Sequence, residues 1–114
     1  MRRFLPVFVA LTAAGFAAVV AYQVLARERQ YQALLARGDA ALSEDQTFGA
    51  IEAYSGAVAL RADSVIARLR RGETYQRRGD FEAAAHDFRA AAALDPAAPR
   101  PLEGLGNVLY QLQQ

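Results

Sequence analysis

The sequence repeats itself with a period of 34 residues, and this repeat restricts the possible folds more than any other feature. Three glycines follow one another at this spacing, and two of them precede a triplet of small, aromatic and small residues. Residues spaced four and three apart share one face of an α-helix, so each triplet predicts a helix that packs closely on its neighbour. The residues are Gly38, Gly72 and Gly106, then Ala50, Tyr54 and Ala57, and Ala84, Phe88 and Ala91.

This pattern resembles the tetratricopeptide repeat family, whose period is 34 residues. The resemblance covers Tyr31 to Gln114 and implies antiparallel helix pairs stacked into a short α-solenoid. We therefore expect an all-α chain in which an N-terminal segment, 1–30, precedes about two and a half repeats. Their boundaries are 31–64, 65–98 and a partial repeat, 99–114.

Local signals predict where the repeat helices begin and end. We expect helices at about 46–60, 65–78 and 81–94, and a last helix that follows a proline-rich lead and runs to about residue 113. Asp63-Ser64 supplies the expected N-cap of the second of these helices, and Asp80 is the expected N-cap of the third. Asp95-Pro96 ends the third, because the residue before a proline is disfavoured in the α region.

The last helix resembles the first helix of a third repeat without its second helix. It carries Leu102, Leu105, Val108, Leu109 and Leu112. A single repeat cannot bury its apolar face alone. Either this helix caps the array, or a partner covers it, or the chain is a fragment of a longer one, and we favour the last two.

The N-terminal segment contains 19 uncharged residues, Phe4 to Tyr22, after Arg2 and Arg3. Continued to Ala26, it can cross a bilayer core of about 30 Å at about 1.5 Å per residue. A cleaved signal peptide is the alternative, but the apolar run exceeds the usual length of a signal core. Since residues 23–37 are mostly good helix formers, we expect the transmembrane helix to continue into the first repeat helix.

Small residues form a continuous stripe along this transmembrane helix. In lipid, small residues allow helices to approach closely, so the stripe predicts a face that docks another transmembrane helix. The alternative is that alanine is simply abundant in this chain. The stripe consists of Ala10, Ala13, Ala14, Ala17, Ala18 and Ala21.

By resemblance, the first helices of the repeats line a concave groove that binds a peptide or a protein segment. The set mixes acidic and basic residues and does not match the Lys/Asn/Arg clamp that some family members use for C-terminal carboxylates. A solvated face is the alternative. The groove positions are Leu35, Asp39, Leu42, Leu69, Glu73, Gln76, Arg77 and Asn107, with Gln32, Ile66, Arg100 and Glu103 beside them.

A dense run of arginines lies in the second repeat. The run could hold an acidic partner or anionic headgroups, but acidic residues are close in sequence and favour an ordinary soluble surface. Arg71 also replaces the leucine that the family usually has before the glycine. The run consists of Arg61, Arg68, Arg70, Arg71, Arg77 and Arg78.

Composition gives no support for catalysis. The chain has no Cys, one His (His86) and a net charge of +1, so thiol chemistry, multi-histidine metal sites and bulk attraction to nucleic acid are excluded. There is no phosphate-binding glycine loop and no nucleophile–base pair. We expect no enzyme activity, no cofactor, no metal and no small-molecule substrate, and we expect His86 to face solvent.

Together these features predict a single-pass membrane protein that acts as a non-catalytic interaction scaffold, an accessory or assembly subunit of a larger membrane complex. A secreted or periplasmic peptide-binding adaptor with a cleaved signal peptide is the alternative. All basic residues are Arg, which suggests a GC-rich bacterial genome. The short basic start favours the inner membrane with the repeats in the periplasm.

Overall fold

The computed structural model describes residues 2–114, which form five α-helices and no strand. This confirms the expected all-α class, and most helices begin and end within a residue of the predicted positions. The last helix starts inside the proline-rich lead because proline is tolerated in the first turn of a helix. The helices are α1 (Leu5–Ser43), α2 (Thr47–Leu60), α3 (Val65–Arg78), α4 (Phe81–Leu94) and α5 (Pro99–Gln113).

Helix α1 is unbroken from Leu5 to Ser43, so the apolar segment does continue into the first helix of the first repeat. The chain divides into two compact units within this helix. The first unit ends at Gln30, and the second runs from Tyr31 to Gln114. In the first unit, every described residue is exposed.

The caps of α3 and α4 differ. Ser64 caps α3 as predicted, since its hydroxyl accepts a hydrogen bond from the Ala67 N–H at 3.0 Å. Asp80 stands at the N-cap position of α4, but its side chain makes no capping bond, so that prediction is wrong. The Asp80 backbone (ψ 69°) departs from the extended conformation that Ser64 adopts (ψ 108°), and its carboxylate lies 3.5 Å from Arg78 Nε instead.

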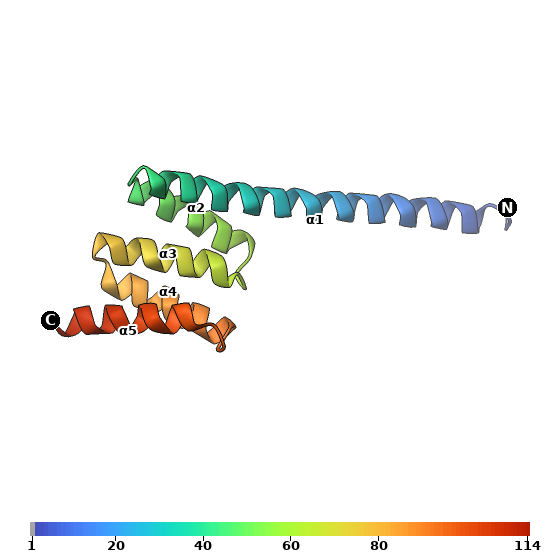
Figure 1. Cartoon of the computed structure of the whole chain (residues 1–114). Helices are drawn as coiled ribbons and strands as arrows, with labels where there is room; N and C mark the ends of the chain where they lie inside the picture. The colour runs from blue at the N-terminus through green and yellow to red at the C-terminus, as the bar shows by residue number, and fades with distance from the viewer. Residues whose placement is uncertain (1) are drawn as a thin grey trace. The chain divides into compact units, whose positions relative to one another are not determined.

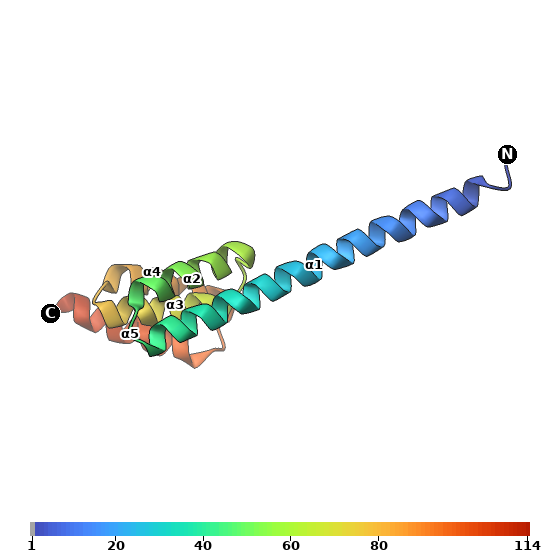
Figure 2. The same ribbon diagram turned by 90° about the horizontal axis from the view of Figure 1, so that it is seen from above.

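Within the unit formed by residues 31–114, consecutive helices run in opposite directions (Figure 1). The C-terminal part of α1, α3 and α5 form one layer, and α2 and α4 form the other (Figure 2). Helix α2 packs on α3, and α4 packs on both α3 and α5. Each helix of the second layer therefore fills the groove between two helices of the first layer.

At the centre of each helix pair, an aromatic ring of one helix packs against a glycine of the other. The Tyr54 ring from α2 lies against Gly38 of α1, and the Phe88 ring from α4 lies against Gly72 of α3. A Cβ atom at Gly72 would lie 3.0 Å from Phe88 Cε1. Both rings are fully buried, as are the alanines of their triplets, Ala50, Ala57, Ala84 and Ala91. The sequence prediction of two closely packed helix pairs is confirmed.

The third glycine of the 34-residue series behaves differently. A Cβ atom added at Gly106 would meet no heavy atom of the described chain within 4 Å, whereas one at Gly104 would lie 2.7 Å from Phe88 Cζ. The close approach of α5 to α4 therefore depends on Gly104, which does not belong to the series. The face of α5 that carries Gly106 is not the face packed on α4.

Gly104→Ala and Gly106→Ala should change stability in opposite directions. At Gly104 the added methyl group must displace the Phe88 ring, which should destabilise the fold by about 1–3 kcal/mol. At Gly106 the methyl group enters open space, and the better helix propensity of alanine should stabilise it by about 0.5–1 kcal/mol. Urea unfolding of the full chain in detergent micelles, followed by circular dichroism, measures both. Equal effects at the two positions would contradict this packing.

Candidate functional site

A cleft of about 440 Å³ lies between the first helices of the first two repeats. Its walls come from the C-terminal part of α1, from the start of α3 and from the turn before α3. Of the predicted groove positions, Leu35, Asp39, Gln32 and Ile66 line it. The remaining lining residues are not among the predicted groove positions, although two of them belong to the arginine run: Tyr31, Ala36, Arg61, Asp63, Ser64, Val65 and Arg70.

The other predicted groove positions lie outside this cleft. The predicted groove positions as a whole also differ in how far their side chains are buried. Leu35 and Leu69 are buried in the two hydrophobic clusters of the repeats. Leu42, Glu73 and Gln76 are half-buried, and Arg77 and Asn107 are exposed. Ile66 is an exposed apolar side chain on the cleft wall, with half of its surface (51%) open to solvent.

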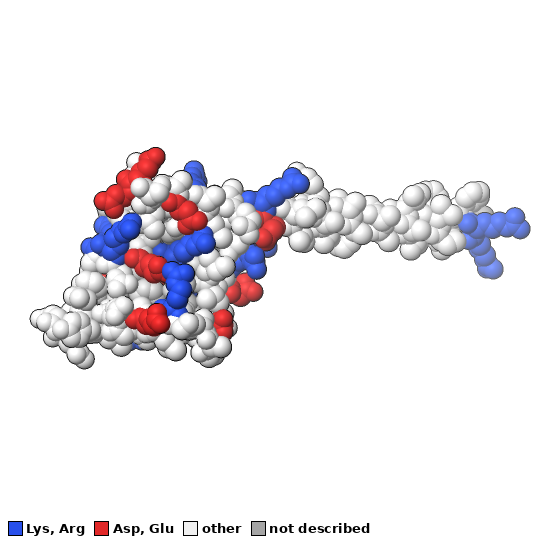
Figure 3. Space-filling model, viewed as in Figure 1, with Lys and Arg blue, Asp and Glu red and all other residues white. Residues whose placement is uncertain are grey.

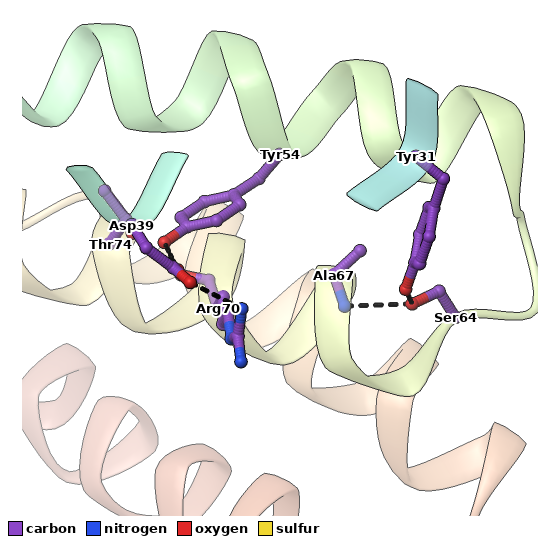
Figure 4. A network of polar contacts seen from close by, with 7 residues as sticks. All are labelled: Tyr31, Asp39, Tyr54, Ser64, Ala67, Arg70 and Thr74. Carbon is purple, nitrogen blue, oxygen red and sulfur yellow. Dashed lines mark hydrogen bonds and ion pairs between the residues drawn. The ribbon is translucent and has the colours of Figure 1, made fainter. Parts of the chain in front are cut away.

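One end of the cleft is fixed by a hydrogen-bonded chain across three helices (Figure 4). The buried Tyr54 hydroxyl of α2 donates to Asp39 Oδ1 of α1 at 2.6 Å. Arg70 of α3 donates to the other oxygen of Asp39 at 2.8 Å. Burial, together with the bond to Asp39, raises the pKa of Tyr54 well above its ordinary value, so the phenol stays protonated and remains a donor.

A second polar contact fixes the other end of the cleft. The Tyr31 hydroxyl lies 2.6 Å from the Ser64 hydroxyl, and Ser64 in turn caps α3 (Figure 4). The Arg61 guanidinium lies over the Tyr31 ring, 4.7 Å from its centroid. The side chains of the cleft walls are thus held by bonds within the fold.

Ion pairs connect the first helices of successive repeats. Asp39 of α1 pairs with Arg70 of α3, and Glu73 of α3, the equivalent of Asp39 one repeat later, pairs with Arg100 of α5 at 2.6 Å. Acidic and basic side chains therefore alternate over this layer, as Figure 3 shows. No region of a single charge sign extends along the cleft, which argues against a strongly acidic or strongly basic ligand.

The arginine run is largely engaged within the fold. Arg71 donates to both oxygens of Asp87, at 2.7 and 2.8 Å, and to the Ser55 hydroxyl at 3.2 Å, so it joins α2, α3 and α4. Only 1% of the Asp87 side chain is exposed. The hydrogen bonds to Asp87 raise the pKa of Arg71 further above its ordinary value. The prediction that Arg71 belongs to a surface run was wrong, because α4 places a buried carboxylate opposite it.

Other members of the run also have partners in the fold. Arg68 donates to the Ala62 carbonyl at 3.1 Å, and Arg77 donates to the Leu42 carbonyl at 3.4 Å. Arg78 lies over the exposed Phe48 ring, 3.6 Å from its centroid. These contacts support the interpretation of the run as ordinary paired surface rather than a binding patch.

The six alanines of the stripe are all exposed, as are the bulky apolar residues around them. Helix α1 is the one described helix long and apolar enough to cross a membrane, and none of its apolar window is buried. A signal sequence would pass the same test of length and composition.

Catalytic groups do not gather in the part of the chain that the structure describes. Residues 2–114 contain no group of three or more His, Asp or Glu side chains that could hold a metal ion. His86 is exposed on α4, as expected.

Comparison with known proteins finds a similar repeat and a similar fold. Residues 65–98, one complete repeat, match the family model described as Tetratricopeptide repeat. A similar solved structure is "First TPR of Spaghetti (RPAP3) bound to HSP90 peptide SRMEEVD", with a TM-score of 0.71 and 20% sequence identity over 75% of this chain and 69% of that chain. No curated protein matches the sequence. The fold is thus a tetratricopeptide-type α-solenoid of about two and a half repeats, preceded by a long apolar helix.

Loss of one partner should cost far more at the buried pair Arg71–Asp87 than at the exposed pair Glu73–Arg100. Arg71→Ala leaves Asp87 buried without its counterion and should cost about 3–5 kcal/mol. Arg100→Ala breaks a pair whose side chains are 66% and 40% exposed, and should cost at most about 1 kcal/mol. Urea unfolding of each variant gives the comparison.

A double variant checks the cause. Arg71→Leu combined with Asp87→Ala places at these positions the residues found one repeat away, Leu105 and Ala53. If the loss in Arg71→Ala comes from the unpaired carboxylate, the double variant should recover most of it. A double variant as unstable as Arg71→Ala would contradict this explanation.

Proposed function

We propose that the protein is a non-catalytic interaction scaffold that binds a protein segment in the cleft between α1 and α3. The observation that carries the proposal is the cleft itself, which combines an exposed apolar side chain, Ile66, with polar walls held in place by the fold. Fixed walls favour binding, because little side-chain entropy is lost when a ligand enters.

The solved tetratricopeptide structure with its HSP90 peptide supports a peptide as the ligand class. The chemistry of the segment should differ from that peptide, which is acidic. Here Asp39 and Asp63 stand beside Arg61 and Arg70, so the cleft is balanced in charge. We propose a segment that places an apolar side chain on Ile66 and flanks it with both basic and acidic groups.

We further propose that residues 5–30 of α1 anchor the scaffold in a bacterial inner membrane, with the repeats in the periplasm. The support is the uncharged run from Phe4 to Ala26, which is long enough to cross a bilayer, with Arg2 and Arg3 before it and Arg27 and Arg29 after it. The alanine stripe would then dock a helix of another subunit, making the protein an accessory or assembly subunit of a membrane complex.

Ile66→Asp should weaken binding in the cleft. A displayed library of random peptides, selected on the full chain in nanodiscs, supplies the ligand. Against the enriched peptides, Ile66→Asp should weaken binding by about tenfold or more, because a charge replaces the apolar contact. His86→Asp on exposed α4 is the matched control and should bind normally. Selection of peptides that bind both variants equally would count against the cleft.

The membrane assignment is tested by the state of the N-terminus in the native membrane. We expect an intact N-terminal segment that resists carbonate extraction, and co-purification of other membrane subunits in mild detergent. Ala14→Leu with Ala18→Leu should release those subunits, because bulky side chains prevent close helix approach. Val19→Ala on the opposite face of the helix serves as the control. A soluble chain that lacks its apolar segment would instead identify a secreted adaptor.

A further inference from the structure

Helix α5 presents to solvent the face that the other first helices keep covered. A second face packs on the preceding repeat through the buried Pro101 and Val108. The uncovered face carries Leu102 and Leu109, which are 52% and 36% exposed, and Gly106 between them. At the equivalent positions, Gly38 and Gly72 are buried. The face therefore corresponds to the acceptor surface of a helix pair, and no second helix of the described residues covers it.

The equivalent faces of α1 and α3, which are covered by α2 and α4, show what kind of helix fits on this face of α5. On Gly38 and Gly72 lie the rings of Tyr54 and Phe88, each in a helix with alanine four residues before the ring and three after it. At Gly106 the space for such a ring is open within the described chain. The chemistry that fits α5 is thus a helix with a small, an aromatic and a small residue at that spacing.

The surface of α5 also restricts which residue the incoming helix can carry directly before the aromatic ring. In α4 it is Asp87, which is satisfied by Arg71 of α3. On α5 the position equivalent to Arg71 is Leu105, so a carboxylate in that place would be buried without a counterion. In α2 the residue is Ala53. The incoming helix should therefore carry alanine or another uncharged small residue there.

A second copy of this chain does not supply such a helix. Both of its matching triplets, in α2 and α4, are already fully buried in its own core. The surface also continues an established interface, since a helix placed on it would extend the two-layer stack by one helix. The partner must then come from outside the described chain.

We propose that the outer face of α5, formed by Leu102, Leu105, Gly106 and Leu109, docks a helix of a partner protein. That helix carries two alanines and, between them, an aromatic residue, at the spacing seen in α2 and α4. The residue directly before the aromatic one is small and uncharged. The partner helix completes the third repeat from outside. This site is separate from the cleft between α1 and α3, so either proposal can fail without the other.

A stapled helical peptide tests the site. The probe is residues 80–95 of this chain with Asp87→Ala, stapled between positions 82 and 86, which are exposed in α4. The staple removes the cost of folding a short helix. Binding to the full chain in nanodiscs is measured by fluorescence anisotropy. Replacing Phe88 of the probe by alanine, or restoring Asp87, should weaken binding by about tenfold or more.

The matched protein variants are Gly106→Leu and Gln111→Leu. Gly106→Leu fills the space for the ring without a clash in the free chain, so the fold is retained while binding should fall by about tenfold or more. Gln111 is exposed on the opposite side of α5, and Gln111→Leu should bind the probe normally. Circular dichroism confirms that both variants are folded.

Three results would overturn the proposal. The first is no binding of the probe up to about 1 mM, a very weak affinity. The second is binding that Gly106→Leu leaves unchanged, which would place the probe elsewhere or in the lipid. The third is a dimer of the chain in nanodiscs that Gly106→Leu dissociates, which would make a second copy the occupant of this face.

Discussion

The contact of an aromatic ring with a helical glycine is the interaction on which the repeat unit depends. Tyr54 on Gly38 and Phe88 on Gly72 bring the helices of each pair close enough for the flanking alanines to be fully buried. With a side chain in place of either glycine, the ring would have to move and the alanines would lose their contacts. The 34-residue period of the sequence reflects this contact, because each repeat needs the glycine and the ring at a fixed distance along the chain.

This dependence explains why the fold could be predicted and why parts of its packing could not. Helix positions and the buried triplets follow from local spacing, so they were found from the sequence. The role of Gly104 follows from how α5 lies on the ring of the preceding repeat, and the equivalent residue one repeat earlier is Arg70, so the 34-residue pattern does not mark this position. The pair Arg71–Asp87 was not predicted for a similar reason. It occurs in one repeat only, and in the sequence Arg71 resembles one of several surface arginines.

The candidate cleft was predicted in part. The resemblance identified the layer of first helices and four of the lining residues, Gln32, Leu35, Asp39 and Ile66. It did not identify Tyr31, Arg61 or Ser64, which belong to the start of one repeat and the turn before the next and come together only in the folded unit. An acid on one first helix and a base on the next, as in Asp39 and Arg70, is a signal that a search for charge pairs between repeats would have found.

The charge pairs also limit what the surface can recognise. Asp39, Arg70, Glu73 and Arg100 neutralise one another across the layer of first helices, and Arg71 is enclosed by Asp87 and Ser55. A ligand must then gain its affinity from shape and from apolar contact rather than from a net field. The apolar side chains that the repeat unit exposes to solvent include Ile66 in the cleft and the leucines of α5. A protein partner, with its mixed surface chemistry, satisfies both conditions better than a small charged ligand does.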